Sequence, residues 1–532
     1  MNLPGAVQDP AWRRLSPRML LVHPVRELGQ AIPALFGLLV AGRAMGGGQL
    51  WWLTPLAVLV VISLSVLRWV TTTYRITPEQ VQLRTGLVQR KTISTPADRV
   101  RSVDVTASAL HRVLGLAKVE IGTGGHEAGG GLSLDSLTVA EAAGLRAELL
   151  HHSATASSPA AVAGAPSDSS EKAPADLADP AVSGGRLAAV AAAPAEQETE
   201  LARMDPRWVR FAPFTMSGVL GAAVILGLGS RLLDQTGINA AEVGPVRGAL
   251  AYLQRTSIWL DVLQGLVGLL VLVTLLSIGG YVLSYWGFRL TRHPHGSLHI
   301  TRGLLTTRAT SIEERRFRGL ELTEPLLLRA VHAGRLRAIT TGLKSRGGTD
   351  GGSSMLLPPA PVEVALDVAT RILRDPAPVL VLLTAHGPAA RRRRLTRALT
   401  GPFVLVLAAA VALWSGASPW LGVVALVTIP LAVLLAADRY RSLGHAVAGR
   451  FLVTRAGSLS RRRDALERDG IIGWNLRQSF FQRRAGLVTL TATTAAGRQR
   501  YAVTDVPLAM AVSLGNRAVP GLLDDFLVAD PA

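Results

Sequence analysis

The sequence of 532 residues contains no cysteine. Disulfide bonds, thiolate catalysis, cysteine-ligated zinc and iron–sulfur clusters are therefore excluded. Charged residues are scarce, at 17% of the chain, and aromatic residues make up only 5%. Lysine occurs only four times, so arginine carries almost all of the formal net charge of +19. Such an excess of basic residues indicates that the protein binds nucleic acid or anionic lipid.

Long apolar runs favour lipid over nucleic acid. A membrane-spanning helix needs roughly 17–25 mostly apolar residues. Six segments of the chain satisfy this condition, and they pair into hairpins within residues 28–70, 206–287 and 399–438. We therefore predict a polytopic membrane protein with about six transmembrane helices.

Arginine placement predicts the orientation of these hairpins. Arginines cluster before each hairpin, as in Arg13 and Arg14 before the first and in the run Arg391–Arg394 before the third, and they follow each hairpin as well. The turns inside the hairpins are poorer in arginine by comparison. Because positive charge is retained on the cytoplasmic side, we predict a multi-pass protein of the cytoplasmic membrane with both termini in the cytoplasm.

A threefold repeat follows the hairpins. An offset of 217 positions places Arg99 on Arg316, and an offset of 371 places Asp98 on Asp469, in each case without a gap. Alternating apolar and polar residues in each repeat predict short strands, and an amphipathic helix closes each repeat. The sequence thus predicts three small β-rich domains over residues 71–150, 288–380 and 439–523.

The first repeat carries the motifs of a known family. It reads YRITPEQVQLRTGLVQR, then Arg-Val-x-x-Val, then Leu-Gly-Leu-Ala leading into Val-Glu-Ile. These motifs resemble the bacterial pleckstrin-homology (PH) domain of the second type, and three such domains with paired spans resemble the YdbT-like proteins. The resemblance implies a seven-stranded, partly open barrel plugged by a C-terminal helix in each repeat. It also implies a smaller two-span PH-domain membrane protein as a partner, and no catalytic activity is established for the family.

The remaining segments are predicted to connect or flank these parts. Residues 151–205 are rich in Ala, Pro and Ser and cannot bury enough apolar surface to fold, so we predict a disordered linker. Residues 381–398 are predicted to be a basic linker. Residues 1–27 are assigned to a cytoplasmic N-terminal segment and residues 524–532 to a tail.

No catalytic, metal-binding or cofactor-binding constellation is apparent in the sequence. The Gly-rich loop at 122–131 is interpreted as a hairpin tip, because no Lys-Ser/Thr pair follows it. His293, His295 and His299 could be metal ligands, but no carboxylate cluster accompanies them, and Pro294 predicts that the segment is a turn. Asp261 is a candidate intramembrane polar site, with an interfacial pair to Arg255 as the alternative.

Basic clusters within the β domains are the other candidates. The arginines at 391–394 are explained by topology alone, whereas Arg461, Arg462 and Arg463 lie well inside the third domain. We predict that these three side chains contact anionic lipid. Nucleic-acid binding is disfavoured, because few aromatic residues stand among the arginines.

These features favour a non-catalytic inner-membrane protein that presents three cytoplasmic PH-like domains. The domains would serve assembly, by self-association or by binding a partner, and the resemblance suggests a role in envelope stress or peptide resistance. The alternative is a component of a membrane transport or export system. That alternative requires polar residues along the helix bundle, and Pro33, Pro55 and Asp261 are a thin set.

The predicted orientation is tested by reporter fusions. Fusions after residues 150, 380 and 532 should all report the cytoplasm, because arginine flanks every hairpin on that side. A periplasmic signal from any one stable fusion would overturn the six-span topology.

Overall fold

The computed structural model describes most of the chain outside the first hairpin and the long linker. The described residues are 12–20, 71–77, 80–86, 90–96, 100, 102–122, 132–145, 198–236, 258–294, 296–341 and 354–524, with isolated positions between 22 and 70. The predicted first membrane hairpin and residues 151–197 of the predicted linker therefore lie outside the described residues, as does the tail beyond residue 524.

Each β domain contains a first sheet built on one hairpin. The hairpins are β3–β4 (Gln80–Thr85 and Lys91–Pro96), β10–β11 (Ser297–Arg302 and Thr307–Glu313) and β16–β17 (Phe451–Ala456 and Ser460–Glu467). Their first pairs are Gln80↔Pro96, Ser297↔Glu313 and Phe451↔Glu467, which the offsets of 217 and 371 interconvert. The strand register therefore follows the sequence repeat.

A second three-stranded arrangement completes each domain. Its strands are β5–β7 (Ser102–Ala107, Leu116–Gly122, Leu132–Thr138), β12–β14 (Phe317–Pro325, Ala333–Thr340, Met355–Pro361) and β18–β20 (Gly473–Arg477, Leu487–Thr493, Arg500–Pro507). A short helix follows the first strand of each set: α3 (Ala109–Val113), α8 (Leu326–Ala330) or α13 (Phe480–Arg484). A helix also follows the third strand, at residues 139–145, in α9 (Val362–Leu373) and in α14 (Leu508–Ala518).

In the first two domains, the strand before the predicted hairpin pairs with the strand that follows it. β1 (Arg13–Arg14) pairs with β2 (Thr73–Ile76), and β8 (Thr199–Arg203) pairs with β9 (Arg289–His293). In the third domain Thr384 forms an isolated bridge to His445 of β15 (Gly444–Ala448). The linker boundary predicted at residue 205 is therefore too late, because β8 belongs to the second domain.

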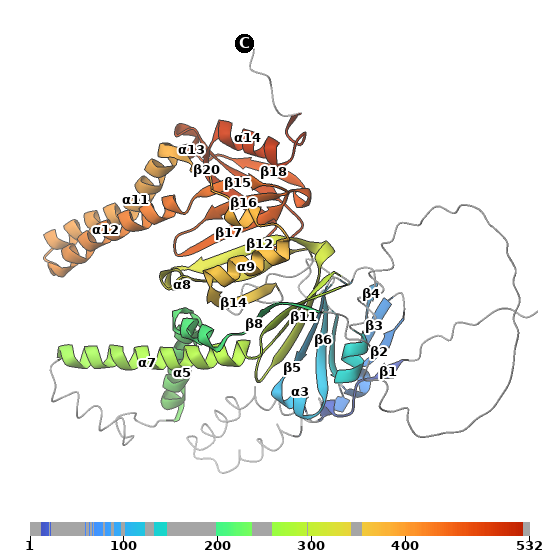
Figure 1. Cartoon of the computed structure of the whole chain (residues 1–532). Coiled ribbons are helices and arrows are strands. Elements are labelled where there is room, and N and C mark those ends of the chain that lie inside the picture. The colour runs from blue at the N-terminus through green and yellow to red at the C-terminus, as the bar shows by residue number, and fades with distance from the viewer. Residues whose placement is uncertain are drawn as a thin grey trace, which may run out of the picture.

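The sheets run across the domain boundaries. One sheet has the order β7-β6-β5-β11-β10-β9-β8, and the next has the order β14-β13-β12-β17-β16-β15. The outer sheets are β1-β2-β3-β4 and β18-β19-β20 (Figure 1). The resemblance implied a barrel for each repeat, whereas the structure joins the second sheet of one domain to the first sheet of the next.

The second and third domains also share one hydrophobic core. A single cluster of buried residues extends from Trp208 and Phe211, before the second hairpin, to Phe451 and Val453 of β16. Tyr281, within the second membrane hairpin, belongs to this cluster. Its hydroxyl donates to the Pro359 carbonyl at 2.8 Å, which ties the hairpin to β14.

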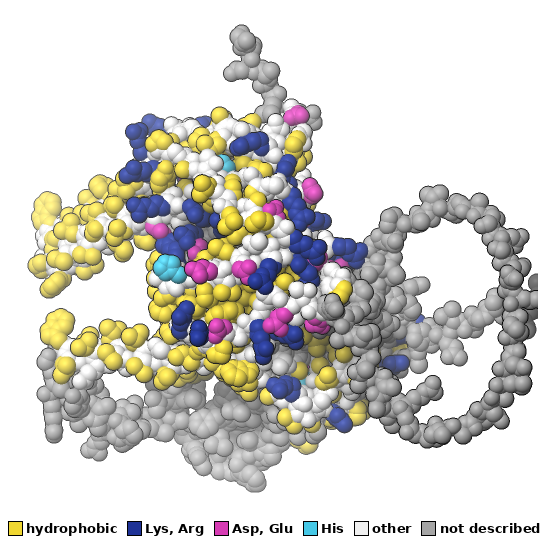
Figure 2. All heavy atoms as spheres, viewed as in Figure 1, with side chains coloured by type: hydrophobic (Ala, Val, Ile, Leu, Met, Phe, Trp, Pro, Cys, Tyr) yellow, Lys and Arg dark blue, Asp and Glu magenta, His cyan; other side chains and the backbone are white. Residues whose placement is uncertain are grey.

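Three described helices are long and apolar enough to cross a membrane. They are Val262–Tyr285 within α7 (Ile258–Tyr285), α11 (Gly387–Trp414) and α12 (Trp420–Arg441). A fourth span is formed if the 3₁₀ helix η3 (Pro206–Phe214) and the first part of α5 (Ser217–Thr236), bent by 60°, count together. α7, α11 and α12 project from the same side of the β domains with hydrophobic surfaces (Figures 1 and 2). α11 begins at Gly387, so most of the predicted basic linker at 381–398 is helical.

The packing of α5 on α7 depends on a glycine. A Cβ atom at Gly218 would lie 1.9 Å from Ser277 Oγ and 2.3 Å from the Val273 carbonyl oxygen. Gly218→Ala should therefore destabilise the protein by about 1–3 kcal/mol, because the two helices must separate. Unfolding in detergent measures this loss. Gly227→Ala on the same helix is the control, since its Cβ meets nothing within 4 Å, and equal effects of the two changes would contradict the packing.

Candidate functional site

The most distinctive sites are two junctions at which neighbouring domains pair their edge strands. At the first junction β5 runs antiparallel to β11, from Val103↔Ser311 to Ala107↔Thr307. At the second junction β12 runs antiparallel to β17, from Gly319↔Leu466 to Pro325↔Ser460. Main-chain hydrogen bonding thus continues from each domain into the next.

The two junctions have the same register. Thr106 faces Arg308 at the first junction, and Thr323 faces Arg462 at the second. The repeat offsets convert one pair into the other, and they do so for every pair that both junctions contain. A shift of one residue would reverse the faces of all the side chains, so a shared register indicates one interface used twice.

Close backbone approach at the second junction requires a glycine. Gly319 on β12 has φ of 144°, and a Cβ there would lie 1.9 Å from the Ala465 carbonyl oxygen of β17. Any larger residue would both strain the backbone and push the two domains apart. Gly319 corresponds to Ser102 in the first repeat and to Gly473 in the third.

Opposite charges meet across the second junction. Arg461 donates twice to the Glu324 carboxylate, at 2.8 Å for each bond, and Arg462 lies 3.8 Å from Glu321. Arg498 binds Asp464 at 2.7 Å and Glu321 at 3.2 Å. Glu321 and Glu324 are both buried, so the arginines compensate carboxylates that have lost their water.

Burial shifts the titration of the junction carboxylates. Burial raises the pKa of Asp464, and Arg498 opposes this shift while Glu321 adds to it. At the first junction, burial likewise raises the pKa of Asp104 on β5. A hydrogen bond with Thr310 and the nearby charge of Arg308, both on β11, act in the opposite direction. Each junction therefore sets a carboxylate of one domain against an arginine of the next.

The sequence-predicted basic cluster is part of the second junction. Arg461 and Arg462 make the ion pairs described above, and Arg463 donates to the Pro378 and Val381 carbonyls at 3.1 Å each. Lipid contact by these residues remains a prediction, but their guanidinium groups already bind protein. Asp261, the other candidate, lies in the first turn of α7, and its side chain is outside the described residues.

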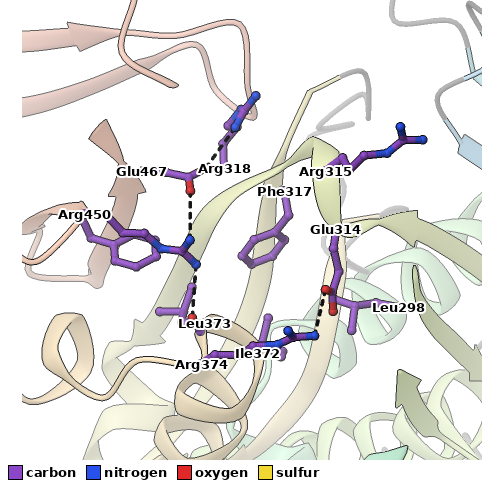
Figure 3. A pocket seen from close by; sticks show the side chains of 11 residues that line it. Leu298, Glu314, Arg315, Phe317, Arg318, Ile372, Leu373, Arg374, Arg450 and Glu467 are labelled. Carbon is purple, nitrogen blue, oxygen red and sulfur yellow. Dashed lines mark hydrogen bonds and ion pairs between the residues drawn. The ribbon is translucent and has the colours of Figure 1, made fainter. Parts of the chain in front are cut away.

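A cleft of about 390 Å³ opens between the second and third domains. Two contacts bridge its walls: Arg318 of β12 binds Glu467 at 3.1 Å, and Arg450 donates to the Leu373 carbonyl at 3.4 Å (Figure 3). Arg374 pairs with Glu314 on the other side at 3.3 Å. The lining consists of Leu298, Glu314, Arg315, Phe317, Arg318, Ile372, Leu373, Arg374, Arg450, Phe451 and Glu467.

The cleft combines an excess of positive charge with apolar side chains. Its lining has four arginines against two glutamates, together with two phenylalanines and aliphatic side chains. The cleft lies near Leu298, toward the start of β10. The other end of β10 is Arg302, and the next residue, Gly303, donates to the carbonyl of Trp286, which directly follows α7. This composition suits an anionic group with an apolar part.

A third site anchors α11 to the third domain. Asp505 is 1% exposed and has left-handed φ of 57°. Arg393 of α11 binds its Oδ1, Arg394 binds its Oδ2 at 2.7 Å, and Gln482 donates to Oδ1 at 2.8 Å. The arginine run was attributed to topology alone. The structure pairs Arg393 with Asp505, which lies 112 positions away, and a contact over that distance leaves no local signal in the sequence.

Two buried histidines lie beside this anchor. His386 Nδ1 donates to the Thr504 carbonyl at 2.9 Å, and His445 Nδ1 donates to His386 Nε2 at 3.0 Å. Burial lowers the pKa of His445 to about 4, and the His386 ring adds to this shift. Burial also lowers the pKa of His386. Both rings are therefore neutral at pH 7, and they link the segment before α11 to β15.

The anchor is tested by Asp505→Asn. The change should destabilise the protein by about 3–5 kcal/mol, because it leaves two largely buried guanidinium groups without a counter-charge. Denaturant unfolding of the purified protein measures the loss. Arg391→Gln is the matched control, since that arginine of the same run is exposed, and it should change stability little. A neutral effect of Asp505→Asn would show that the anchor is not needed.

His293 and His299, two of the histidines considered as metal ligands from the sequence, lie next to each other in the structure. The two rings lie 3.8 Å apart between centroids, and His293 Nε2 lies 2.9 Å from Glu198. No group of three or more metal-binding side chains occurs among the described residues.

Comparison with family models matches two stretches of the chain to the Bacterial PH domain family. The matches cover residues 26–153 and 402–515, which include most of the first and third predicted hairpins and β domains. The second domain lies between them, and its strand registers repeat those of the matched domains. Searches of curated proteins and of solved structures found no match.

Proposed function

Because this chain is a membrane protein of the bacterial PH domain family, we propose that it is a non-catalytic scaffold. Its three β domains form one continuous body on the cytoplasmic face of the membrane and bind other protein subunits there. The single observation that carries this proposal is the repeated junction. The same edge strands, in the same register, join the first domain to the second and the second to the third.

The junctions favour a rigid array over three independent modules. If the domains were independent, their edge strands would be exposed or protected from pairing. At both junctions, the edge strands instead pair with a strand of the neighbouring domain. The second and third domains also share a core. Since relative motion would break main-chain hydrogen bonds and ion pairs together, the domains hold fixed relative positions.

The membrane-proximal end of the array supports its orientation. The turn after β10 is held to the end of α7 by hydrogen bonds from Gly303 N to the Trp286 carbonyl and from Leu304 N to the Leu283 carbonyl, each at 2.9 Å. In the third domain Ser458 donates to Asp438 of α12 at 2.6 Å. Exposed leucines accompany these turns, namely Leu304, Leu305 and Leu459. We infer that this end rests on the bilayer surface while the cleft faces the cytoplasm.

A disulfide across the second junction tests the scaffold. The natural chain has no cysteine, so Thr323→Cys with Arg462→Cys introduces a single pair at facing positions. Facing residues of antiparallel strands lie within the range that a disulfide spans. The bond should form in native membranes on mild oxidation. Absence of the disulfide would contradict the joined array.

Charge reversal shows whether the ion pairs hold the junction closed. Glu324→Arg in the cysteine pair background should lower the disulfide yield, because breaking a largely buried pair costs about 3–5 kcal/mol. Adding Arg461→Glu should restore the yield, since the pair is then reversed. Glu363→Arg on α9 makes the same change at an exposed position and serves as the control.

A further inference from the structure

The second sheet of the third domain has an open edge. β18 is the counterpart of β5 and of the Gly319–Glu324 part of β12 by the repeat offsets. β5 and β12 are each paired on both sides, whereas within the described residues β18 pairs only with β19. Asn475, Leu476 and Arg477 of β18 are exposed. The edge that joins domains elsewhere in the chain is thus available here.

The first sheet of the first domain has the complementary open edge. β4 is the counterpart of β11 and β17, which receive β5 and β12 at the two junctions. In the described part of the chain, β4 pairs with β3 alone. Lys91 and Thr92 on this strand are exposed. Within the residues that the structure describes, one copy of each half of the junction is therefore unpaired.

We propose that β18 of one chain pairs with β4 of a second copy, antiparallel and in the register of the internal junctions. The offsets then place Leu476 opposite Thr92 and Arg477 opposite Lys91. This inference rests on the proposed scaffold function and specifies its self-assembly surface. The contact is heterologous, so repeated use makes a ring if the rotation closes and a filament if it does not.

The arrangement of the membrane helices permits this contact. The second junction relates two domains whose hairpins, with α7 in one and α11–α12 in the other, project from the same side of the array (Figure 1). Repeating the same pairing between chains keeps α7 and α11–α12 of each copy on that side. The copies would therefore associate laterally within one membrane.

Apolar residues beside β18 add to the contact. At the internal junctions the short helix after the pairing strand touches the next domain: Arg112 of α3 donates to the Leu304 carbonyl at 2.7 Å, and Leu326 N of α8 donates to the Leu459 carbonyl at 2.8 Å. α13 is the corresponding helix in the third domain. Its Phe480 and Phe481 are 60% and 72% exposed, and a second copy would cover them.

Charge distinguishes the intermolecular junction from the internal ones. β12 brings carboxylates to the arginines of β17, and β5 brings Asp104 to the arginine of β11. Arg477 would instead face Lys91, and like charges directly opposite each other weaken a strand pair. Contact between copies is therefore weaker than the internal junctions and is strengthened by salt.

Two differently tagged copies of the full chain test the proposal in native membranes. One copy carries Leu476→Cys and the other carries Thr92→Cys, and a disulfide between them is the expected result. A chain with Val105→Cys and Ala309→Cys, the equivalent facing pair of the first junction, is the internal control. Failure of that control would count against the scaffold itself. If the control chain crosslinks but no disulfide forms between the two copies, only the self-assembly proposal is overturned.

Charge variants make the test specific for register. Arg477→Glu in the first copy should raise the crosslinked fraction by up to about fivefold, because it faces Lys91. Lys91→Glu in the second copy should do the same, and the two changes together should cancel. Crosslinking that ignores both charges, or a disulfide from Leu476→Cys only to a different protein, would overturn the proposal.

Discussion

The structure depends on main-chain pairing between the edge strands of successive domains. β5 with β11 and β12 with β17 convert three small β domains into one body, and they do so without any segment dedicated to the purpose. Edge strands are normally a hazard, because unpaired main-chain groups recruit other chains. In this chain the edge strands of successive domains pair with each other. The register of that pairing follows the same sequence repeat that produces the strands.

Side chains make this generic pairing specific. Backbone hydrogen bonds alone tolerate sliding, whereas Glu324 with Arg461 and the close approach at Gly319 fit one register only. Arg461 and Arg462 of β17 therefore pair with carboxylates of the preceding domain, and Arg463 binds main-chain carbonyls. Arg393 and Arg394 show the same principle at the membrane end, where a buried Asp505 receives two arginines. Much of the positive charge of the described chain is used within the fold.

The sequence predicted the repeating elements and missed what joins them. Strand alternation and constant offsets identified three β domains, because both signals are local or periodic. The three long apolar helices of the described chain were found for the same reason. The strand before each hairpin was missed, since β8 lies far along the chain from its partner β9 and inside a segment of linker-like composition. The pairing of Arg461 with Glu324 was missed because contacts between distant segments leave no periodic pattern in the sequence.

Membrane insertion and sheet continuity constrain one another. The second hairpin leaves its sheet between the adjacent strands β8 and β9, so the direction of its helices is fixed by the sheet. Because a junction relates neighbouring sheets, it also relates their hairpins, and only a junction that keeps both hairpins on one side is compatible with a single bilayer. An interface of that kind is suitable for reuse between chains, since the membrane has already aligned the copies. In that proposed contact, the like charges of Arg477 and Lys91 would make the pairing between chains weaker at low ionic strength than at high.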